Sequence, residues 1–205
     1  MGDLRLAKSL EDLKKVLPTL EESKGFNLAD CDGFNFGRYP EYFNGKLRDE
    51  EIVWRVLDKA STSILAISSF ALDSKPFDKD GNTNNWEDCS LKKWLNEDFY
   101  HQAFTKEEME LIEDTPSGKI FLLDKEEAEK YFILNFNRSC KPTRYAKKQG
   151  AEIRFGNCWW WLRSHGEFCE SKVCTSYINI EGNIKDDGLI FDGKGAVRPA
   201  LRLKI

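Results

Sequence analysis

Two cysteines near the end of the chain, Cys169 and Cys174, are the residues whose type and spacing could most directly do chemistry. A thiol pair five residues apart can stay reduced, close a disulfide or bind a soft metal ion. On a straight strand, positions 169 and 174 would face opposite sides of the sheet. We therefore expect two separate reduced thiols, with a disulfide and a metal or redox pair as the alternatives.

The other spacings do not complete known metal or catalytic motifs. The six cysteines contain no C-x-x-C pair and the chain has only two histidines, so a structural zinc site is not expected. Residues 78–87 begin like a calcium-binding loop, but Thr83 stands where that loop needs glycine. His165 directly follows Ser164, and no third residue can be placed to complete a catalytic triad. We therefore assign no catalytic residue.

Aromatic and cationic residues gather in two apolar segments. Residues 159–161 are all tryptophan, and because strand residues alternate between faces, one of them should face away from the core. We expect the tryptophans, Trp160 among them, to pack in the core, with one edge lining a ligand pocket as the alternative. Arg163 and Arg198 need partners in such strands, so a structural hydrogen-bond network is predicted for both. Recognition of a carboxylate or phosphate ligand is the alternative.

The polar stretch between these segments, about residues 164–195, is the predicted binding surface, because function concentrates on loops held by rigid elements. Its aspartates at positions 186, 187 and 192 are either solvated or meet a cation or a basic partner. Phe168 is the best anchor candidate, since aromatic residues dominate binding hot spots. The predicted ligand-binding residues are His165, Glu167, Phe168, Tyr177 and Asp187.

Composition narrows the class of protein. The 205 residues are 40% hydrophobic and 13% aromatic, which is enough for one sizeable core. The formal net charge is −4 and the lysines and arginines are scattered, so no nucleic-acid partner is expected. The first residues carry no apolar stretch, so no signal peptide is expected, and no run of about eighteen apolar residues occurs, so no membrane span is expected. Six cysteines in such a chain indicate reduced thiols and a cytoplasmic location.

Leucines in alternating steps of four and three predict an amphipathic helix over residues 3–22. We expect this helix to dock on the main domain, with oligomerisation or partner binding as the alternative. Residues 1–24 are therefore assigned to the helix and a linker, and residues 25–205 to the main domain.

Strands are predicted at both ends of the main domain and helices in its middle, which indicates an α+β fold. Residues 51–58 and 62–68 should form a hairpin. Capping boxes begin helices after Thr105 and Asp124, and a third short helix over residues 143–149 should end at Gly150. Residues 158–163 and 196–203 are predicted to be buried central strands of one sheet, with an edge or bulge at Pro199.

Several short motifs occur in a characteristic order: FGRYP at residues 36–40, WRVL at 54–57, SLKKWLN at 90–96, FLL at 121–123, WWLRS at 160–164 and VRPAL at 197–201. Together they resemble a family of bacterial domains of unknown function that occurs in gut Firmicutes and their phages. The resemblance covers about residues 30–205. That family is similar to the C-type-lectin-like superfamily, and the resemblance implies a C-type-lectin-like domain.

The superfamily includes the variable proteins of diversity-generating retroelements, which carry their binding residues in a segment equivalent to residues 164–195. The resemblance thus implies a non-enzymatic binding module with a protein or glycan ligand and no cofactor. The superfamily also includes sulfatase-modifying factors, which would make Cys169 and Cys174 the copper ligands of a formylglycine-generating oxidase. The third alternative is a structural module, for example in a phage particle, that forms homo-oligomers through the N-terminal helix.

Overall fold

The computed structural model of the chain describes residues 6–7, 33–166 and 173–204. Of the predicted N-terminal helix only Leu6 and Ala7 are described, and for them the prediction is wrong, because they form the short strand β1 (Leu6–Ala7). This strand pairs in parallel with β2 (Gly33–Phe43), so hydrogen bonding along the edge of β2, and not the leucine spacing, decides its conformation. The rest of the predicted helix, its linker and the boundary at residue 24 lie outside the described residues.

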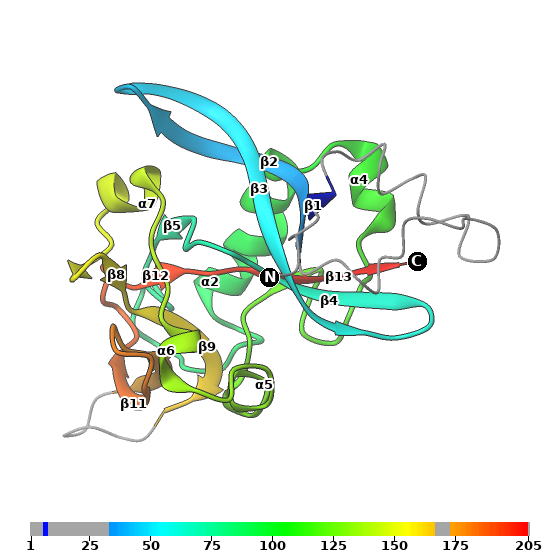
Figure 1. The fold of residues 1–205 in the computed structure, drawn as a ribbon. Helices are drawn as coiled ribbons and strands as arrows, with labels where there is room; N and C mark the ends of the chain where they lie inside the picture. The colour runs from blue at the N-terminus through cyan, green and yellow to red at the C-terminus, as the bar shows by residue number, and fades with distance from the viewer. Residues whose placement is uncertain (1–5, 8–32, 167–172, 205) are drawn as a thin grey trace.

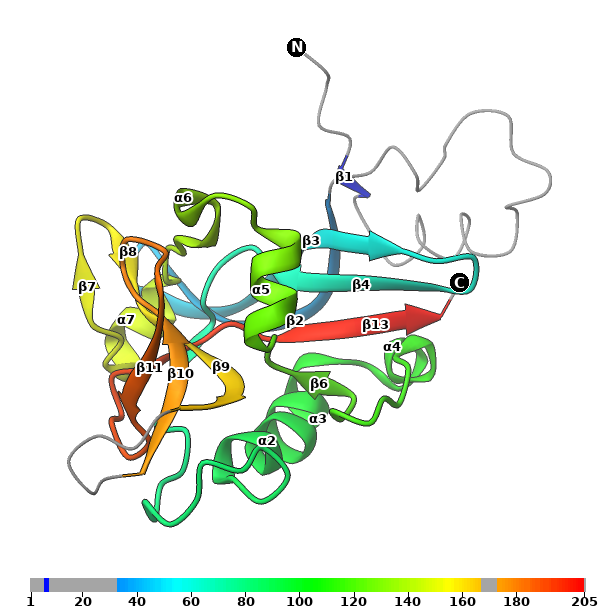
Figure 2. The ribbon, with the colours of Figure 1, turned by 90° about the horizontal axis from the view of Figure 1, so that it is seen from below.

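Two sheets form the framework, and Figures 1 and 2 show them from two directions. The larger sheet has the strand order β1, β2, β3 (Lys46–Lys59), β4 (Ser63–Ser68), β13 (Ala200–Lys204) and β6 (Ile120–Phe121). The smaller sheet has the order β11 (Ile184–Leu189), β10 (Cys174–Ile178), β9 (Trp160–His165), β12 (Ala196–Val197) and β5 (Asp73–Ser74). A separate hairpin consists of β7 (Ile153–Arg154) and β8 (Asn157–Cys158).

The helices lie in the middle of the chain, as predicted, and the architecture is α+β. One continuous helical stretch contains α2 (Ser90–Trp94), the π-helical turn η2 (Leu95–Phe99) and α3 (Tyr100–Ala103). The others are α4 (Lys106–Leu111), α5 (Lys125–Tyr131), α6 (Asn135–Arg138) and α7 (Arg144–Gln149). Among the described residues, no helix has the length and apolar character needed to cross a membrane.

Local sequence signals set several helix boundaries. Thr105 with Glu108 and Asp124 with Glu127 both form reciprocal capping boxes, which supply partners for backbone N–H groups at the starts of α4 and α5. Gly150 ends α7 in the left-handed region, at a φ of 115° that residues with a side chain rarely adopt. These three predictions are confirmed.

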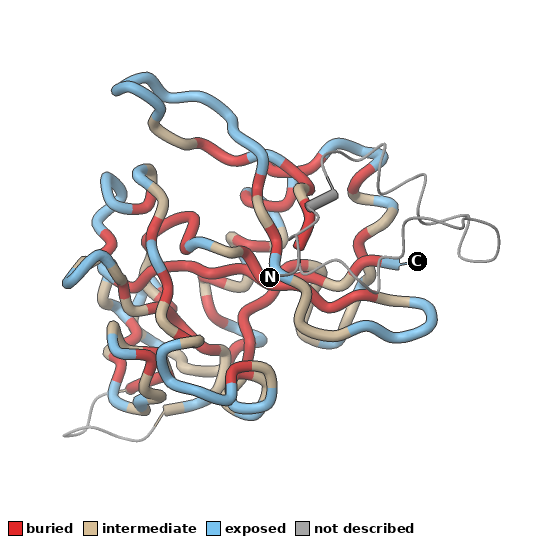
Figure 3. Tube along the Cα trace, in the orientation of Figure 1, coloured by how far each residue is buried: buried red, intermediate tan, exposed pale blue. Residues whose placement is uncertain are grey.

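The predicted hairpin of β3 and β4 is also confirmed, since the two strands pair antiparallel across the short link after Lys59. A second hairpin, which the sequence analysis did not predict, joins β2 and β3. Asn44 and Gly45 form its turn with φ angles of 50° and 78°. The far end of this hairpin is exposed, as Figure 3 shows. No apolar pattern marks this exposed end in the sequence, and β3 begins five residues before the predicted strand of residues 51–58.

The two predicted C-terminal strands are buried but do not stay in one sheet, so that part of the prediction is wrong. Ala196 in β12 pairs in parallel with Trp160 in β9, within the smaller sheet. After Pro199 the chain continues as β13, which pairs with β4 and β6 in the larger sheet. Proline has no N–H to donate to a ladder, and here it stands where the chain passes from one sheet to the other.

Buried side chains from both sheets and from the central helices form one continuous core, drawn in red in Figure 3. Its largest members, which are fully buried, include Trp54, Trp160, Trp161, Phe34 and Phe77. The core prediction for Trp160 and Trp161 therefore agrees with their burial, whereas Trp159 is only partly buried.

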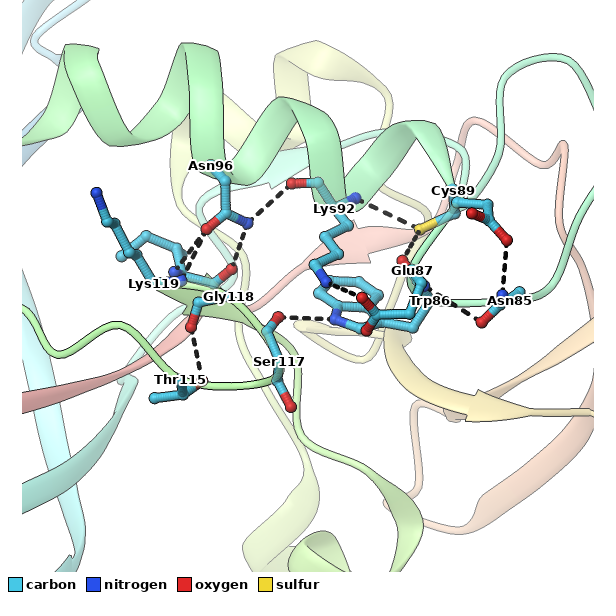
Figure 4. A network of polar contacts seen from close by, with 12 residues as sticks. Asn85, Trp86, Glu87, Cys89, Lys92, Asn96, Thr115, Ser117, Gly118 and Lys119 are labelled. Carbon is cyan, nitrogen blue, oxygen red and sulfur yellow. Dashed lines mark hydrogen bonds and ion pairs between the residues drawn. The ribbon is translucent and has the colours of Figure 1, made fainter.

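Asn96 ties the central helices to the segment before β6, as Figure 4 shows. Its Oδ1 atom accepts hydrogen bonds from the backbone N–H groups of Lys119, at 2.8 Å, and Ile120, at 3.2 Å. Its Nδ2 atom donates to the carbonyl oxygens of Lys92 and Ile120, both at 2.9 Å. A nearby indole N–H, that of Trp86, donates to the carbonyl of Ser117 at 2.8 Å. These bonds give the last residue of the SLKKWLN motif a structural role.

We predict that Asn96→Ala lowers the free energy of unfolding by about 2–3 kcal/mol, because it leaves partly buried backbone groups without partners. Urea unfolding followed by circular dichroism would measure this. The neighbouring exposed residue gives the control, and Glu97→Ala should change stability by less than about 0.5 kcal/mol. Equal effects of the two substitutions would contradict the role of Asn96.

Candidate functional site

A cleft of about 410 Å³ lies where the β7–β8 hairpin approaches strands β10 and β11. We call it the β10–β11 cleft. Its volume falls within the range of small-ligand pockets, which begins at about 300 Å³. The residues that line it are Glu152, Arg154, Trp159, Tyr177, Asn179, Ile180, Glu181, Asp187, Gly188, Leu189 and Asp192.

Two partly buried aromatic side chains form one wall of the cleft. The rings of Trp159 and Tyr177 lie edge to face, with 5.2 Å between their centroids. Trp159 also packs edge to face on the buried ring of Trp161, at 4.6 Å. A register shift in β10 between Thr175 and Tyr177 changes the pairing with both neighbouring strands. Such bulges redirect side chains, which accounts for an aromatic ring at this edge.

Glycine backbone is needed beneath these rings. A Cβ atom on Gly188 would lie 2.8 Å from the ring of Trp161 and 2.9 Å from that of Tyr177. A Cβ atom on Gly195 would lie 2.1 Å from Nε1 of Trp161, whose N–H donates to the carbonyl of Lys75. The two glycines therefore let the aromatic rings lie directly against neighbouring backbone.

Four carboxylates also line the cleft, those of Glu152, Glu181, Asp187 and Asp192. Arg154, the only cation among the described residues of the lining, donates two hydrogen bonds to Oε1 of Glu152, at 3.2 and 2.9 Å. Glu181, Asp187 and Asp192 form no ion pair with a lysine or arginine among the described residues. The cleft therefore combines an aromatic wall with a net negative charge.

The structure brings together two of the five residues predicted to bind ligand. Tyr177 and Asp187 both line the cleft. His165 is exposed but lies four residues beyond Trp161 along β9, which corresponds to about 13 Å. Its Nδ1 atom lies 3.4 Å from the side-chain oxygen of Asn84. Glu167 and Phe168 lie outside the described residues.

The aspartates of β11 do not act as one cluster. Asp186 accepts hydrogen bonds from Lys125 at 2.8 Å and from Ser176 at 2.7 Å. Partial burial opposes its ionisation, but these two bonds and the charge of Lys125 prevail and lower the pKa of Asp186. The next residue, Asp187, is exposed and lines the cleft. Strand alternation therefore separates a paired carboxylate from one that is open to ligand.

Both predicted structural arginines have partners inside the protein. Arg163 forms ion pairs with Asp124 at 2.6 Å and with Glu127 at 2.5 Å. It also donates to the carbonyl of Leu122, so it joins β9 to the start of α5. Arg198 is 3% exposed and donates from Nε to the carbonyl of Ser68, at 3.0 Å.

The cysteine pair singled out in the sequence is described only in part. Cys174 is a buried free thiol at the start of β10, and Cys169 lies outside the described residues. Within the described part of the chain, no group of three or more histidine, cysteine, aspartate or glutamate residues could hold a metal ion.

Sequence reasoning missed the contribution of the β7–β8 hairpin, which brings Glu152, Arg154 and Trp159 to the cleft. The signal in the sequence was Gly156, since glycine is typical of tight hairpin turns, and in the structure Phe155 and Gly156 form such a turn with φ angles of 53° and 84°. Phe155 at this turn is 99% exposed, which is unusual for a phenylalanine, and it marks the hairpin as a surface feature.

A second cavity, of about 540 Å³, lies beside α2. Its lining includes Lys75 and Trp94, and the Lys75 ammonium lies 4.5 Å from the ring centre of Trp94. Lys75 is also 3.8 Å from the carboxylate of Asp73. The cation and the aromatic ring are thus already paired with each other, which makes this cavity the weaker candidate.

We predict that Gly195→Ala destabilises the protein by about 1–3 kcal/mol, because the added methyl group overlaps the Trp161 indole and displaces the aromatic wall. Gly193→Ala is the matched control, since no atom of the described part of the chain lies within 4 Å of a Cβ built there. Thermal unfolding followed by tryptophan fluorescence would compare the two. Similar melting temperatures for both variants would show that the Trp161–Gly195 contact is not tight.

No curated protein and no solved structure matches the chain. One protein family does match: residues 53–205 fit the domain of unknown function DUF6273. This match begins inside β3, whereas β2 pairs along much of the same strand and contributes Phe34 and Phe36 to the core. The described structure therefore extends the folded unit at least to residue 33. Because the match covers more than half of the chain, the protein belongs to the DUF6273 family.

Proposed function

We propose that the chain is a binding module and that the β10–β11 cleft receives a basic side chain, lysine or arginine, of a protein partner. The observation that carries this proposal is the pairing of an aromatic wall, Trp159 and Tyr177, with carboxylates that have no basic partner of their own. Aromatic faces and carboxylates both attract cations, and together they define a site for a group that is positively charged and partly apolar.

The energies involved indicate a weak single contact. A cation over an aromatic ring contributes about 0.5–2 kcal/mol. Each exposed ion pair with Glu181, Asp187 or Asp192 adds roughly 0.2–1 kcal/mol. The sum of a few kcal/mol corresponds to a Kd near 1 mM for one side chain. A biological partner would therefore add contacts outside the cleft, and the exposed Phe155 of the β7–β8 hairpin is well placed for one.

The kinship with C-type-lectin-like domains is part of this proposal. It is supported by the α+β architecture and by the position of the cleft, most of whose lining residues lie between 177 and 192. This segment falls within residues 164–195, the part of the chain that corresponds to the binding segment of retroelement variable proteins. A binding module of this kind could act in the cytoplasm or in a phage particle.

A glycan is the alternative ligand. The carboxylates without basic partners favour a cationic ligand over a neutral sugar.

Titration with a tetralysine peptide, followed by tryptophan fluorescence, tests the proposal. We predict saturable binding in the millimolar range that weakens as NaCl rises, because salt screens exposed charges. Asp187→Asn should weaken binding about threefold to fivefold, since it removes one ion pair worth up to about 1 kcal/mol. Trp159→Ala should weaken it further.

The matched control for charge is Glu129→Gln, which removes an exposed carboxylate from α5, outside the cleft lining. This variant should bind the peptide as the wild type does. Titration with a neutral tetrasaccharide provides the second arm. Saturable sugar binding that Asp187→Asn leaves unchanged, together with no response to the peptide, would exclude a cationic ligand and favour a glycan.

A further inference from the structure

Cys140 and Cys158 face each other in the interior, although eighteen positions separate them in the sequence. They are opposite residues of an isolated antiparallel bridge, and the N–H of Cys158 donates to the carbonyl of Cys140 at 2.9 Å. Both are buried, with 2% of Cys140 and 0% of Cys158 exposed, and both are free thiols. Each thiol donates a hydrogen bond of 3.5 Å to a backbone carbonyl, Cys140 to that of Lys141 and Cys158 to that of Cys140.

Arg198 gives this thiol pair a positively charged environment. Its guanidinium stacks over the rings of Trp160 and Phe132, at 5.0 and 5.3 Å from their centres. Its Nη1 atom is buried and finds no hydrogen-bond partner among the described residues. No carboxylate within the described residues forms an ion pair with it. A buried cation without an anion is costly, so a thiolate in its neighbourhood would be stabilised.

We propose that Cys140 and Cys158 form a buried redox-active dithiol that hydrogen peroxide converts into a reversible disulfide. Opposite residues of an antiparallel pair have Cα atoms about 4.5–5.5 Å apart. That separation lies inside the range of about 4.4–6.8 Å that disulfides span, so closure requires little movement of the backbone. The small size of peroxide suits thiols that larger oxidants cannot reach.

The two thiols have different chemical roles. Burial opposes ionisation of Cys140, but the adjacent Cys158 thiol and the charge of Arg198 outweigh it and lower the pKa of Cys140. The adjacent Cys140 thiol, together with burial, raises the pKa of Cys158. Cys140 is therefore the nucleophile, since thiolates and not thiols attack peroxide.

The reaction balances in two steps. The Cys140 thiolate attacks one peroxide oxygen, the O–O bond breaks, and the departing hydroxide takes up a proton to become water. The sulfur of Cys158 then attacks the resulting sulfenic acid, an S–S bond forms, and the S–O bond breaks. The proton of Cys158 leaves with that oxygen as a second water. Two electrons pass from the two thiols to one peroxide, and a dithiol reductant reverses the change.

Peptide mapping of the full chain tests this proposal. The protein is treated with hydrogen peroxide, its remaining thiols are alkylated, and it is digested without reduction for mass spectrometry. We expect a linked pair of peptides that contains Cys140 and Cys158, lacks two hydrogen atoms and separates on treatment with dithiothreitol. Cys89 is the internal control, because burial raises the pKa of its thiol to about 11 and it should be recovered alkylated.

A Cys158→Ser variant provides the second measurement. With no resolving thiol, it should accumulate Cys140 sulfenic acid that dimedone traps, several-fold more than in the wild type. If this variant does not fold, the peptide map of the wild-type protein decides the test by itself. Recovery of Cys140 and Cys158 as alkylated thiols after Cys89 has been oxidised would overturn the proposal. A disulfide from either residue to a different cysteine would also overturn it.

Discussion

One segment of the chain contributes strands to both sheets, and the buried Arg198 holds it where it passes from one sheet to the other. The proposed sites depend on this crossing. On one side of this residue the carbonyl of Val197 accepts a hydrogen bond from Leu72, and on the other the carbonyl of Pro199 accepts one from Ser68. The Arg198 side chain closes the arrangement by donating to the carbonyl of Ser68 and stacking on Trp160. The crossing thus fixes how the larger sheet meets the smaller one.

The proposed sites both follow from this crossing. Ala196 pairs with Trp160, and the N–H of Ala196 donates to the carbonyl of Trp159, so the same segment positions the aromatic wall of the cleft. Cys158 directly precedes Trp159, and its thiol and that of Cys140 lie in the field of Arg198. The proposed binding cleft and the proposed dithiol are therefore neighbours along one short piece of chain.

The sequence predicted features that depend on residues close together along the chain. The capping boxes at Thr105 and Asp124 need a partner three residues away, and both formed as expected. The strand pairing of the segment around Pro199 could not be predicted in this way, because its two halves pair with strands of different sheets. The pairing of Cys140 with Cys158 likewise depends on a long-range bridge that no local spacing encodes. Tyr177 and Asp187 could be predicted as binding residues because they stand within the polar C-terminal segment itself. Trp159 lies outside that segment, and only the fold brings it into the same cleft.

Nuclear magnetic resonance of the ¹⁵N-labelled protein, titrated with tetralysine, tests the central claim most directly because it locates the contact. The account predicts that the indole N–H signal of Trp159 and the backbone signals of Tyr177 and Asp187 shift together and saturate with one common Kd. Signals near the end of β9, at His165, should stay in place. Shifts confined to residues outside the β10–β11 cleft, or no saturable shift at any residue, would contradict it.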